Sequence, residues 1–184
     1  TTAFGGSVRC VYETVRRHRA APTPSAGIRR RPSHLLEALP KADVVCDTDG
    51  SVLNPTELGP GAAAFVLHDG DGVRHARAEQ AGAMSYTAEL CAVVLAADCL
   101  LTRAAVPRGE EIRILVDNRS VVKVLGMGHH RGRDALGQQA IAKLARVCKA
   151  YGAHVTVQWI PAHCGLRGNE EVDALVAEVH SRPG

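Results

Sequence analysis

The stretch Ala42-Asp43-Val44-Val45-Cys46-Asp47-Thr48-Asp49-Gly50-Ser51 reads as a mostly apolar strand that closes on a carboxylate, Asp49. Residues 43–49 predict the strand, and Gly50 opens a turn-rich loop that reaches Gly61. A carboxylate at the end of a buried strand costs free energy unless it is paired or holds a metal ion. An Asp-Gly pair alone is more often a turn, so the meaning of Asp49 depends on the segments that follow.

Those segments alternate strands and helices. The pattern predicts strands at residues 62–67, 73–81, 112–116 and 155–160, and helices at 86–105, 120–125, 134–151 and 169–179. Residues 68–72 predict a hairpin turn, and Gly152 predicts a helix C-cap. Three hairpin-linked strands followed by alternating helices and strands predict an α/β fold, with a five-stranded mixed sheet flanked by helices.

Three further acidic residues fall at comparable places on this map. Glu89 lies in the first turn of the central helix, Asp117 ends the strand 112–116, and Asp173 lies in the first turns of the last helix. If the strands that carry Asp49 and Asp117 are parallel neighbours, both carboxylates emerge at the same edge of the sheet. Each residue alone is more often a turn, a cap or a helix-start residue favoured by the helix dipole.

Four converging carboxylates cannot all ionise without a cation, so either some stay protonated or divalent ions bind. An all-oxygen site of this kind suits Mg²⁺, with Mn²⁺ as a substitute. Two ions about 4 Å apart would suit phosphodiester cleavage. His163, in a loop just before Asp173, could move protons or assist product release there. The ordinary alternative is an exposed loop histidine, which is the reading kept for His129 and His130.

The composition favours one domain with an appendage. The chain has 184 residues, of which 46% are hydrophobic, and no uninterrupted apolar run approaches the roughly 18 residues of a membrane span, so no membrane partner is expected. The six cysteines form no Cys-x-x-Cys pair, which favours reduced structural thiols over zinc ligands. We therefore expect an intracellular protein, nuclear or cytoplasmic and not secreted.

The basic charge belongs to the N-terminal part of the chain. Residues 1–43 carry eight basic and three acidic residues, a net charge of +5, so the remainder carries −2 of the total +3. The division expected is a basic segment punctuated by Pro, Ser and Gly at 1–41, a domain at 42–180 and a tail at 181–184. Within the segment, only residues 8–19 and 34–39 could form short helices. It either binds a phosphate backbone or is a solvated tail.

Four motifs in order resemble type 1 ribonuclease H over residues 42–180. They are Thr48-Asp49-Gly50-Ser51, Thr87-Ala88-Glu89-Leu90, Val116-Asp117-Asn118-Arg119-Ser120, and the pair Trp159-Ile160-Pro161-Ala162-His163-Cys164-Gly165 and Gly168-Asn169-Glu170-Glu171-Val172-Asp173. Within the family, the chain looks most like the ribonuclease H domain of non-LTR retrotransposon polyproteins, of the trypanosomatid kind. Any one of these motifs alone would be weak, whereas the ordered set is specific.

The resemblance implies an endonuclease that hydrolyses the RNA strand of RNA–DNA hybrids by two-metal-ion catalysis and leaves 3′-hydroxyl and 5′-phosphate ends. Asp49 would bridge both ions, Glu89 and Asp117 would hold the ion on the nucleophile side, and Asp173 the other. His163 would be the loop histidine, and Glu89 would also sense a ribose 2′-hydroxyl. The residues implied for hybrid contacts are Asn54, Ser85, Thr87, Asn118, Arg119 and Asn169. A reverse transcriptase domain of the same polyprotein would be the partner.

The chain departs from the family's pattern in two places. Asn118 follows the third aspartate, where many members have serine, and residues 126–133 are too short for the basic protrusion with which some bacterial members grip the hybrid. The arginine-rich N-terminal segment or the reverse transcriptase domain would then supply that grip.

Two alternatives stay open beside the active nuclease. One is a catalytically inactive nucleic-acid-binding or structural module of the same fold, against which the retention of all four acids argues. The other is a different metal nuclease, a relative of Holliday-junction resolvases or transposases, against which the loop at 159–165 and the spacing from Asn169 to Asp173 argue.

Overall fold

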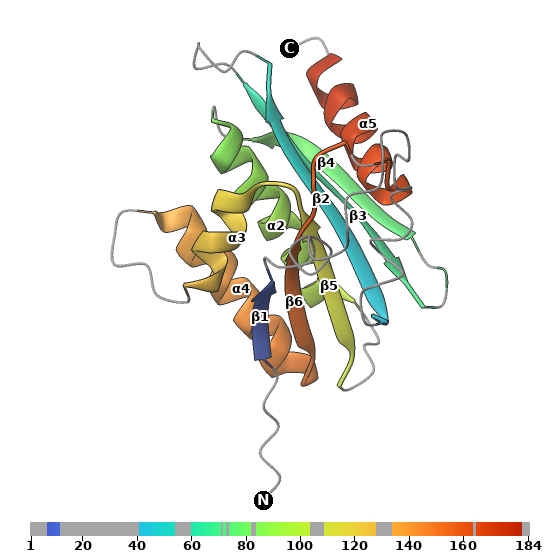
Figure 1. Cartoon of the computed structure of the whole chain (residues 1–184), viewed down its shortest axis with the longest axis vertical. Helices are drawn as coiled ribbons and strands as arrows, with labels where there is room; N and C mark the ends of the chain where they lie inside the picture. The colour runs from blue at the N-terminus through green and yellow to red at the C-terminus, as the bar shows by residue number, and fades with distance from the viewer. Residues whose placement is uncertain are drawn as a thin grey trace, which may run out of the picture.

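The computed structural model describes residues 7–11, 41–53, 60–70, 72, 74–81, 84–103, 109–127, 134–163 and 165–181. The strands are β1 (Ser7–Val11), β2 (Val44–Val52), β3 (Gly61–Asp69), β4 (Arg74–Ala81), β5 (Glu111–Val116) and β6 (His154–Trp159). The helices are α2 (Ser85–Thr102), α3 (Arg119–Gly126), α4 (Ala135–Tyr151) and α5 (Arg167–Ser181). Figure 1 shows these helices packed against a single twisted sheet.

The sheet is mixed, as the order of the elements predicts. Its strands lie in the order β1-β6-β5-β2-β3-β4. The pairs β2–β3 and β3–β4 are antiparallel, whereas β2–β5, β5–β6 and β1–β6 are parallel. The expected hairpin joins β3 to β4: the Gly72 N–H donates to the Asp69 carbonyl at 3.1 Å, and Gly72 has a φ of +79° that favours glycine. The prediction of an α/β fold with a mixed sheet is therefore confirmed.

The sixth strand is a correction to the expected five. Residues 8–19 were expected to be at most a short helix, but Ser7–Val11 form β1, which pairs in parallel with β6 in the register Val8↔Val155. Residues 12–40 lie outside the described part of the chain. Without β1, β6 would be an edge strand with unpaired N–H and C=O groups. Pairing with β6 decides the conformation of Ser7–Val11, and local propensity does not predict that pairing.

Two cores cover the two faces of the sheet. On one face, Val44 and Cys46 of β2 are buried in a large cluster with residues of α2, α3 and α4. On the other face, Val172, Val176 and Val179 of α5 pack on alternate residues of β3, namely Ala62, Ala64 and Val66. Because strand side chains alternate between faces, β2 and β3 contribute to both layers. The carboxylates of the candidate site are thereby placed where strands from the middle of the sheet meet helices from both sides.

Helix α2 is the central helix, as its apolar residues on several faces predict. It packs on β2 and β3 and also on α4. Its length and its mean hydropathy of 1.4 would suffice for a membrane span, but 56% of it is buried inside the protein. The core helix of a globular domain passes the same test, so its apolar composition is explained by packing.

The two ends of α4 lie within one residue of the ends expected from the sequence. Asp134 caps α4 by accepting from the Gly137 N–H at 2.9 Å, and Gly152 ends it with a left-handed φ of 63°. The five cysteines in the described ranges are free thiols, as expected for structural residues, and Cys164 lies outside those ranges.

Candidate active site

Asp49 lies inside β2 and not at its end. The strand continues to Val52, but its parallel pairing with β5 stops at Asp47↔Leu115. Asp49 therefore lies just past the point where the two parallel strands part, and Asp117 directly follows the last residue of β5. The expectation that both carboxylates reach the same edge of the sheet holds, although β2 itself runs on through its antiparallel pairing with β3.

Glu89 reaches the same place from α2. It was expected in the first turn, but α2 begins at Ser85, so Glu89 lies in the second turn, where the helix dipole stabilises an anion less. Gly50 brings α2 close to β2: a Cβ atom on Gly50 would lie 2.2 Å from the Ala88 carbonyl carbon and from the Glu89 nitrogen. Only glycine permits this approach of the two backbones, which places Glu89 beside Asp49.

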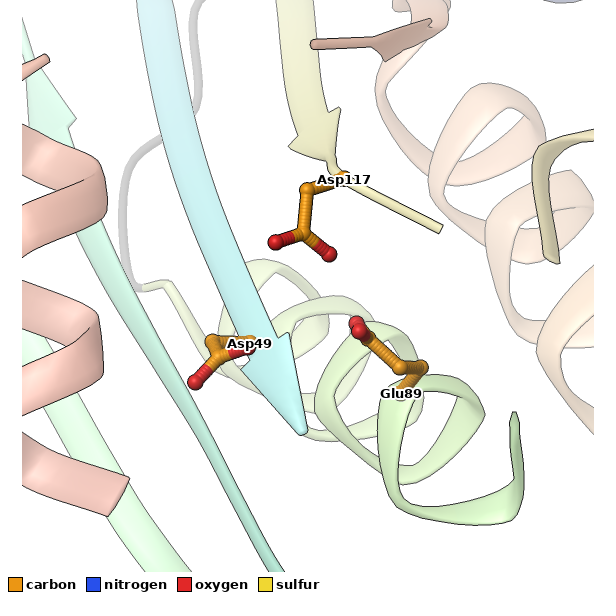
Figure 2. Close-up of side chains that lie close together, drawn as sticks. All are labelled: Asp49, Glu89 and Asp117. Atoms are coloured by element: carbon orange, nitrogen blue, oxygen red, sulfur yellow. The ribbon is translucent and has the colours of Figure 1, made fainter. Parts of the chain in front are cut away.

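These three acids form a compact cluster. One carboxylate oxygen from each of Asp49, Glu89 and Asp117 lies within 4.8 Å of the other two. Figure 2 shows the three side chains arriving from β2, α2 and the end of β5. Oxygens at this separation can be spanned by divalent cations that bind at roughly 2.0–2.6 Å from each ligand.

Asp173 faces the cluster from α5 and pairs with His163. It lies in the second turn of α5, and its Oδ2 is 3.3 Å from His163 Nδ1. The His163 side chain is 84% exposed, and its φ of 49° is in the left-handed region. Asn169 Nδ2 lies 3.5 Å from the same Asp173 oxygen. Asp173 is thus held by two neighbours on one side of the cavity, with an exposed histidine at the rim.

The burial and mutual repulsion of the clustered carboxylates favour a bound cation. Burial, and then the charges of Asp173 and Asp117, raise the pKa of Asp49 to about 6. Burial, followed by the charge and hydrogen bond of Asp117, raises the pKa of Glu89 to about 10. Burial also raises the pKa of Asp173, although His163 opposes that shift. Glu89 is 4% exposed, and its Oε2 has no hydrogen-bond partner within the described ranges. An all-oxygen donor set with an unpartnered buried oxygen fits a hard divalent ion.

A cavity of about 480 Å³ contains the four acids and His163. Its lining residues are Asp49, Gly50, Ser51, Ser85, Glu89, Asp117, Asn118, Ala162, His163, Asp173, Val176, Ala177 and His180. Of the residues expected to contact a hybrid, Ser85 and Asn118 therefore border the carboxylates. Asn54 lies outside the described residues.

Thr87, Asn169 and Arg119 do not line the cavity, and they and Asn118 make local contacts within the fold. Thr87 closes the first turn of α2, where its Oγ1 donates to the Met84 carbonyl at 2.8 Å. Asn118 caps α3 by accepting from the Ser120 N–H at 2.9 Å. Asn169 is 2% exposed. The Arg119 guanidinium lies 4.1 Å from the centre of the Trp159 ring. Arg119 is exposed and stays available to a nucleic acid, whereas the cap occupies the Asn118 oxygen.

Three residues of this region were given no role in the sequence analysis, although Trp159 and Ser51 lie in its motifs. The Trp159 Nε1–H donates to the Asp117 carbonyl at 2.9 Å and so fixes the backbone of a cluster residue. Ser51 and His180 line the cavity, and Ser51 Oγ lies 2.9 Å from His180 Nε2. His180 follows Asp173 by seven residues, a spacing that places both on one helix face, so helical periodicity could have found it.

A buried carboxylate outside the cavity was also missed. Asp47 is 5% exposed, and burial, followed by the charge of Glu171, raises its pKa to about 7. A Cβ on Gly168 would lie 2.0 Å from Asp47 Oδ2, so this glycine lets the start of α5 approach β2. Alternation along the strand does not separate this aspartate from Asp49, which has the same parity, and only the motif Thr48-Asp49-Gly50-Ser51 singles out Asp49.

The chain is similar to known proteins over most of its length. The family model for RNase H matches residues 41–181. RNase H1 from the halophilic archaeon Halobacterium salinarum is 22% identical, with a TM-score of 0.57 over 74% of this chain and 96% of that chain. LC11-RNase H1, isolated from compost by a metagenomic approach, is 20% identical, with a TM-score of 0.58 over 77% of this chain and 100% of its own.

A second structure of LC11-RNase H1, in complex with an RNA/DNA hybrid, is 22% identical, with a TM-score of 0.53 over 75% of this chain and 99% of that chain. At these identities the structural matches establish the shared fold, whereas the family match rests on the sequence itself. The chain therefore belongs to the RNase H family and is a ribonuclease H.

Proposed function

We propose that this ribonuclease H hydrolyses the RNA strand of RNA–DNA hybrids with two divalent metal ions, Mg²⁺ in the first place and Mn²⁺ as a substitute. The observation that carries the proposal is the cluster of Asp49, Glu89 and Asp117, whose oxygens lie within 4.8 Å of one another, with Asp173 on the same cavity. The complex of LC11-RNase H1 with an RNA/DNA hybrid supports the choice of substrate.

Each carboxylate has a proposed part in holding the ions. Asp49 feels the charges of both Asp117 and Asp173 and would be shared, Glu89 and Asp117 would hold one ion, and Asp173 would hold the other. When bound, such ions activate a water molecule and stabilise the leaving oxygen. The pKa of Glu89, about 10 without metal, means that this side chain gives up a proton when it becomes a ligand. The products would be 3′-hydroxyl and 5′-phosphate ends.

The residues around the acids would position the hybrid and move protons. Glu89 would also sense a ribose 2′-hydroxyl, which is the group that separates RNA from DNA. Ser85 and Asn118 border the cavity beside the carboxylates. His163 contacts Asp173 and is exposed at the rim, so it can carry a proton between the site and water or assist product release.

The test is cleavage of a labelled RNA–DNA hybrid beside duplex DNA and duplex RNA, with Mg²⁺, with Mn²⁺ and with a chelator. We expect metal-dependent cleavage of the RNA strand of the hybrid alone. Asp49→Asn should lower the rate by at least about a hundredfold, because it removes the shared ligand. Normal turnover by Asp49→Asn would refute the metal assignment.

The alternative is a module that binds nucleic acid without cleaving it. Hybrid binding by a folded wild-type protein, with no cleavage in either metal, would select this alternative.

We also propose that the enzyme serves retrotransposon reverse transcription beside a reverse transcriptase domain, inside the cell. The resemblance of its motifs to non-LTR polyproteins and the +5 charge of residues 1–43 support this placement. The proposal predicts faster RNA removal during cDNA synthesis when the two domains are joined than when they are mixed as separate chains. Equal rates for joined and separate domains would contradict it.

A further inference from the structure

The cavity of the four carboxylates continues along α5 to a second polar pair, Ser51 and His180. Both residues line the cavity, and Ser51 Oγ lies 2.9 Å from His180 Nε2. Val176 and Ala177 of α5 also line it. A volume of about 480 Å³ is in the range of sites that enclose whole small molecules, so the metal ions alone would leave much of it free.

His180 is too far from the carboxylates to share their ligand. Asp173 and His180 are seven residues apart on α5, which puts them on one face of the helix and roughly 10 Å apart along its axis. A phosphate group held beside Asp173 is therefore about two helical turns away from His180 along α5. His180, which is half-buried, therefore lines a part of the cavity away from Asp173.

The chemistry of the pair suits an anionic oxygen. When the Ser51 hydroxyl donates to Nε2, the neutral imidazole carries its proton on Nδ1, and a protonated ring carries one there as well. A neutral ring with its proton on Nε2 would instead donate to Ser51 Oγ. In the two states with a proton on Nδ1, that N–H is a donor whose direction Ser51 fixes. The pair therefore supplies a hydrogen-bond donor at the end of a cavity whose other polar residues are mostly carboxylate acceptors.

We propose that His180, oriented by Ser51, binds a backbone phosphate of the cleaved RNA strand next to the scissile one. This rests on the proposed function, since it assumes a hybrid in the cavity. His180 is then a positioning residue that holds the register of the strand over the carboxylates. It contributes to affinity and to the choice of the bond that is cut, and it takes no part in the chemical step.

The experiment measures hybrid binding in the Asp49→Asn background, where cleavage does not interfere. We expect His180→Ala to weaken binding about tenfold, the usual effect of losing a hydrogen bond to a charged group. Ser51→Ala should weaken it by about threefold, because the imidazole stays but loses its orientation. His180→Gln keeps an amide donor and should recover part of the loss. His154→Ala is the matched control. His154 is the first residue of β6, does not line the cavity, and pairs through Nδ1 with Ser7 Oγ at 3.2 Å.

The ligand is identified with hybrids in which single RNA-strand phosphates are replaced by neutral methylphosphonates. One position near the scissile bond should weaken binding to the Asp49→Asn protein, and the same position should have no further effect once His180→Ala is added. A purely structural His180 would lower stability without changing this phosphate map, which would overturn the proposal. A 2′-deoxy substitution in the RNA strand is the second probe. If His180→Ala removes the effect of that substitution and not the effect of a methylphosphonate, the phosphate assignment is overturned. Failure of the wild type to cleave any hybrid would instead contradict the proposed function.

Discussion

Glu89 has the most costly environment of the four acids around the cavity. It is 4% exposed, its Oε2 has no hydrogen-bond partner among the described residues, and its pKa of about 10 shows that the protein alone does not stabilise its charge. A buried polar atom without a partner costs about 1–3 kcal/mol. A divalent ion would supply the missing partner, so metal binding relieves an energetic cost that the folded protein carries without it.

Asp49→Asn should stabilise the metal-free protein at pH 8 by about 1–2 kcal/mol. The folded pKa of Asp49, about 6, lies above its ordinary value of 3.8, so the folded state binds the proton more tightly than the unfolded state. The charged carboxylate therefore destabilises the fold above pH 6, and this penalty disappears as the pH falls through 6 towards 4. Urea unfolding in chelator at pH 8 and pH 4 checks it. An equal difference at both pH values would mean that the charge is not the cause.

The contact between β2 and α2 is the element-scale feature that creates the site. Gly50 follows Asp49, and the α2 backbone at Ala88 and Glu89 lies directly against it. One strand–helix contact thus sets the separation of two metal-binding side chains. A site held between a strand and a helix is more rigid than one built on loops, because backbone pairing and packing fix both elements.

Gly50→Ala should disrupt this contact. The new methyl group would meet backbone atoms at 2.2 Å, which no side-chain rotation relieves, so α2 must move away from β2. We expect a loss of about 3 kcal/mol in the free energy of unfolding and a large loss of cleavage. Gly70→Ala is the control, because its Cβ would lie 3.6 Å from the nearest atom, and its stability should be unchanged or slightly higher. Full activity in Gly50→Ala would contradict the geometry of the contact.

β1 should stabilise the edge of the sheet at β6. Removing residues 1–11 exposes that edge, and we expect the free energy of unfolding to fall by about 1–3 kcal/mol. Hydrogen exchange of the β6 amides should speed up. Removing only residues 1–6, which leaves Ser7–Val11 in place, is the matched control. Equal exchange at β6 in the two truncated proteins would show that β1 does not protect it.

At the scale of the whole molecule, the acidic cavity must accept a polyanionic substrate. The chain outside residues 1–43 carries a net charge of −2, so we propose that the positive field comes largely from bound metal and from the N-terminal segment. Metal loading and hybrid binding are therefore expected to support each other, because each cation offsets the repulsion between carboxylates and phosphates.

Neutralising the six arginines at positions 16, 17, 19, 29, 30 and 31 to glutamine should weaken hybrid binding. This change spares β1, whereas deletion of residues 1–40 would remove that strand as well. We expect the slope of log affinity against log salt to flatten by about 0.9 for each backbone phosphate that the arginines no longer neutralise. A protein with residues 12–40 shuffled, which keeps the charge, should bind like the wild type. An unchanged slope in the neutralised protein would mean that other residues bind the phosphates of the hybrid.

The order of the strands and helices from β2 onward and the identity of the four acids could be predicted from the sequence. Alternation in 62–67 and helical spacing in 86–105 are local properties, and the ordered motifs single out Asp49, Glu89, Asp117 and Asp173. The predictions erred by a few residues at the ends. Glu89 lies one residue further into its helix than expected, in the second turn, because α2 begins at Ser85 and not at residue 86. β2 extends beyond Asp49 because β3 pairs with it to Val52.

The sequence by itself determined the fold class, the family and which carboxylates are available, because periodicity and motif order are written along the chain. Only the tertiary structure decided that Ser7–Val11 form a strand, that Gly50 brings α2 against β2, and that Ser51 pairs with His180. The physical reason is that backbone pairing, close approach and cavity lining depend on segments far apart in the chain, and no local pattern records which distant segment will be the neighbour.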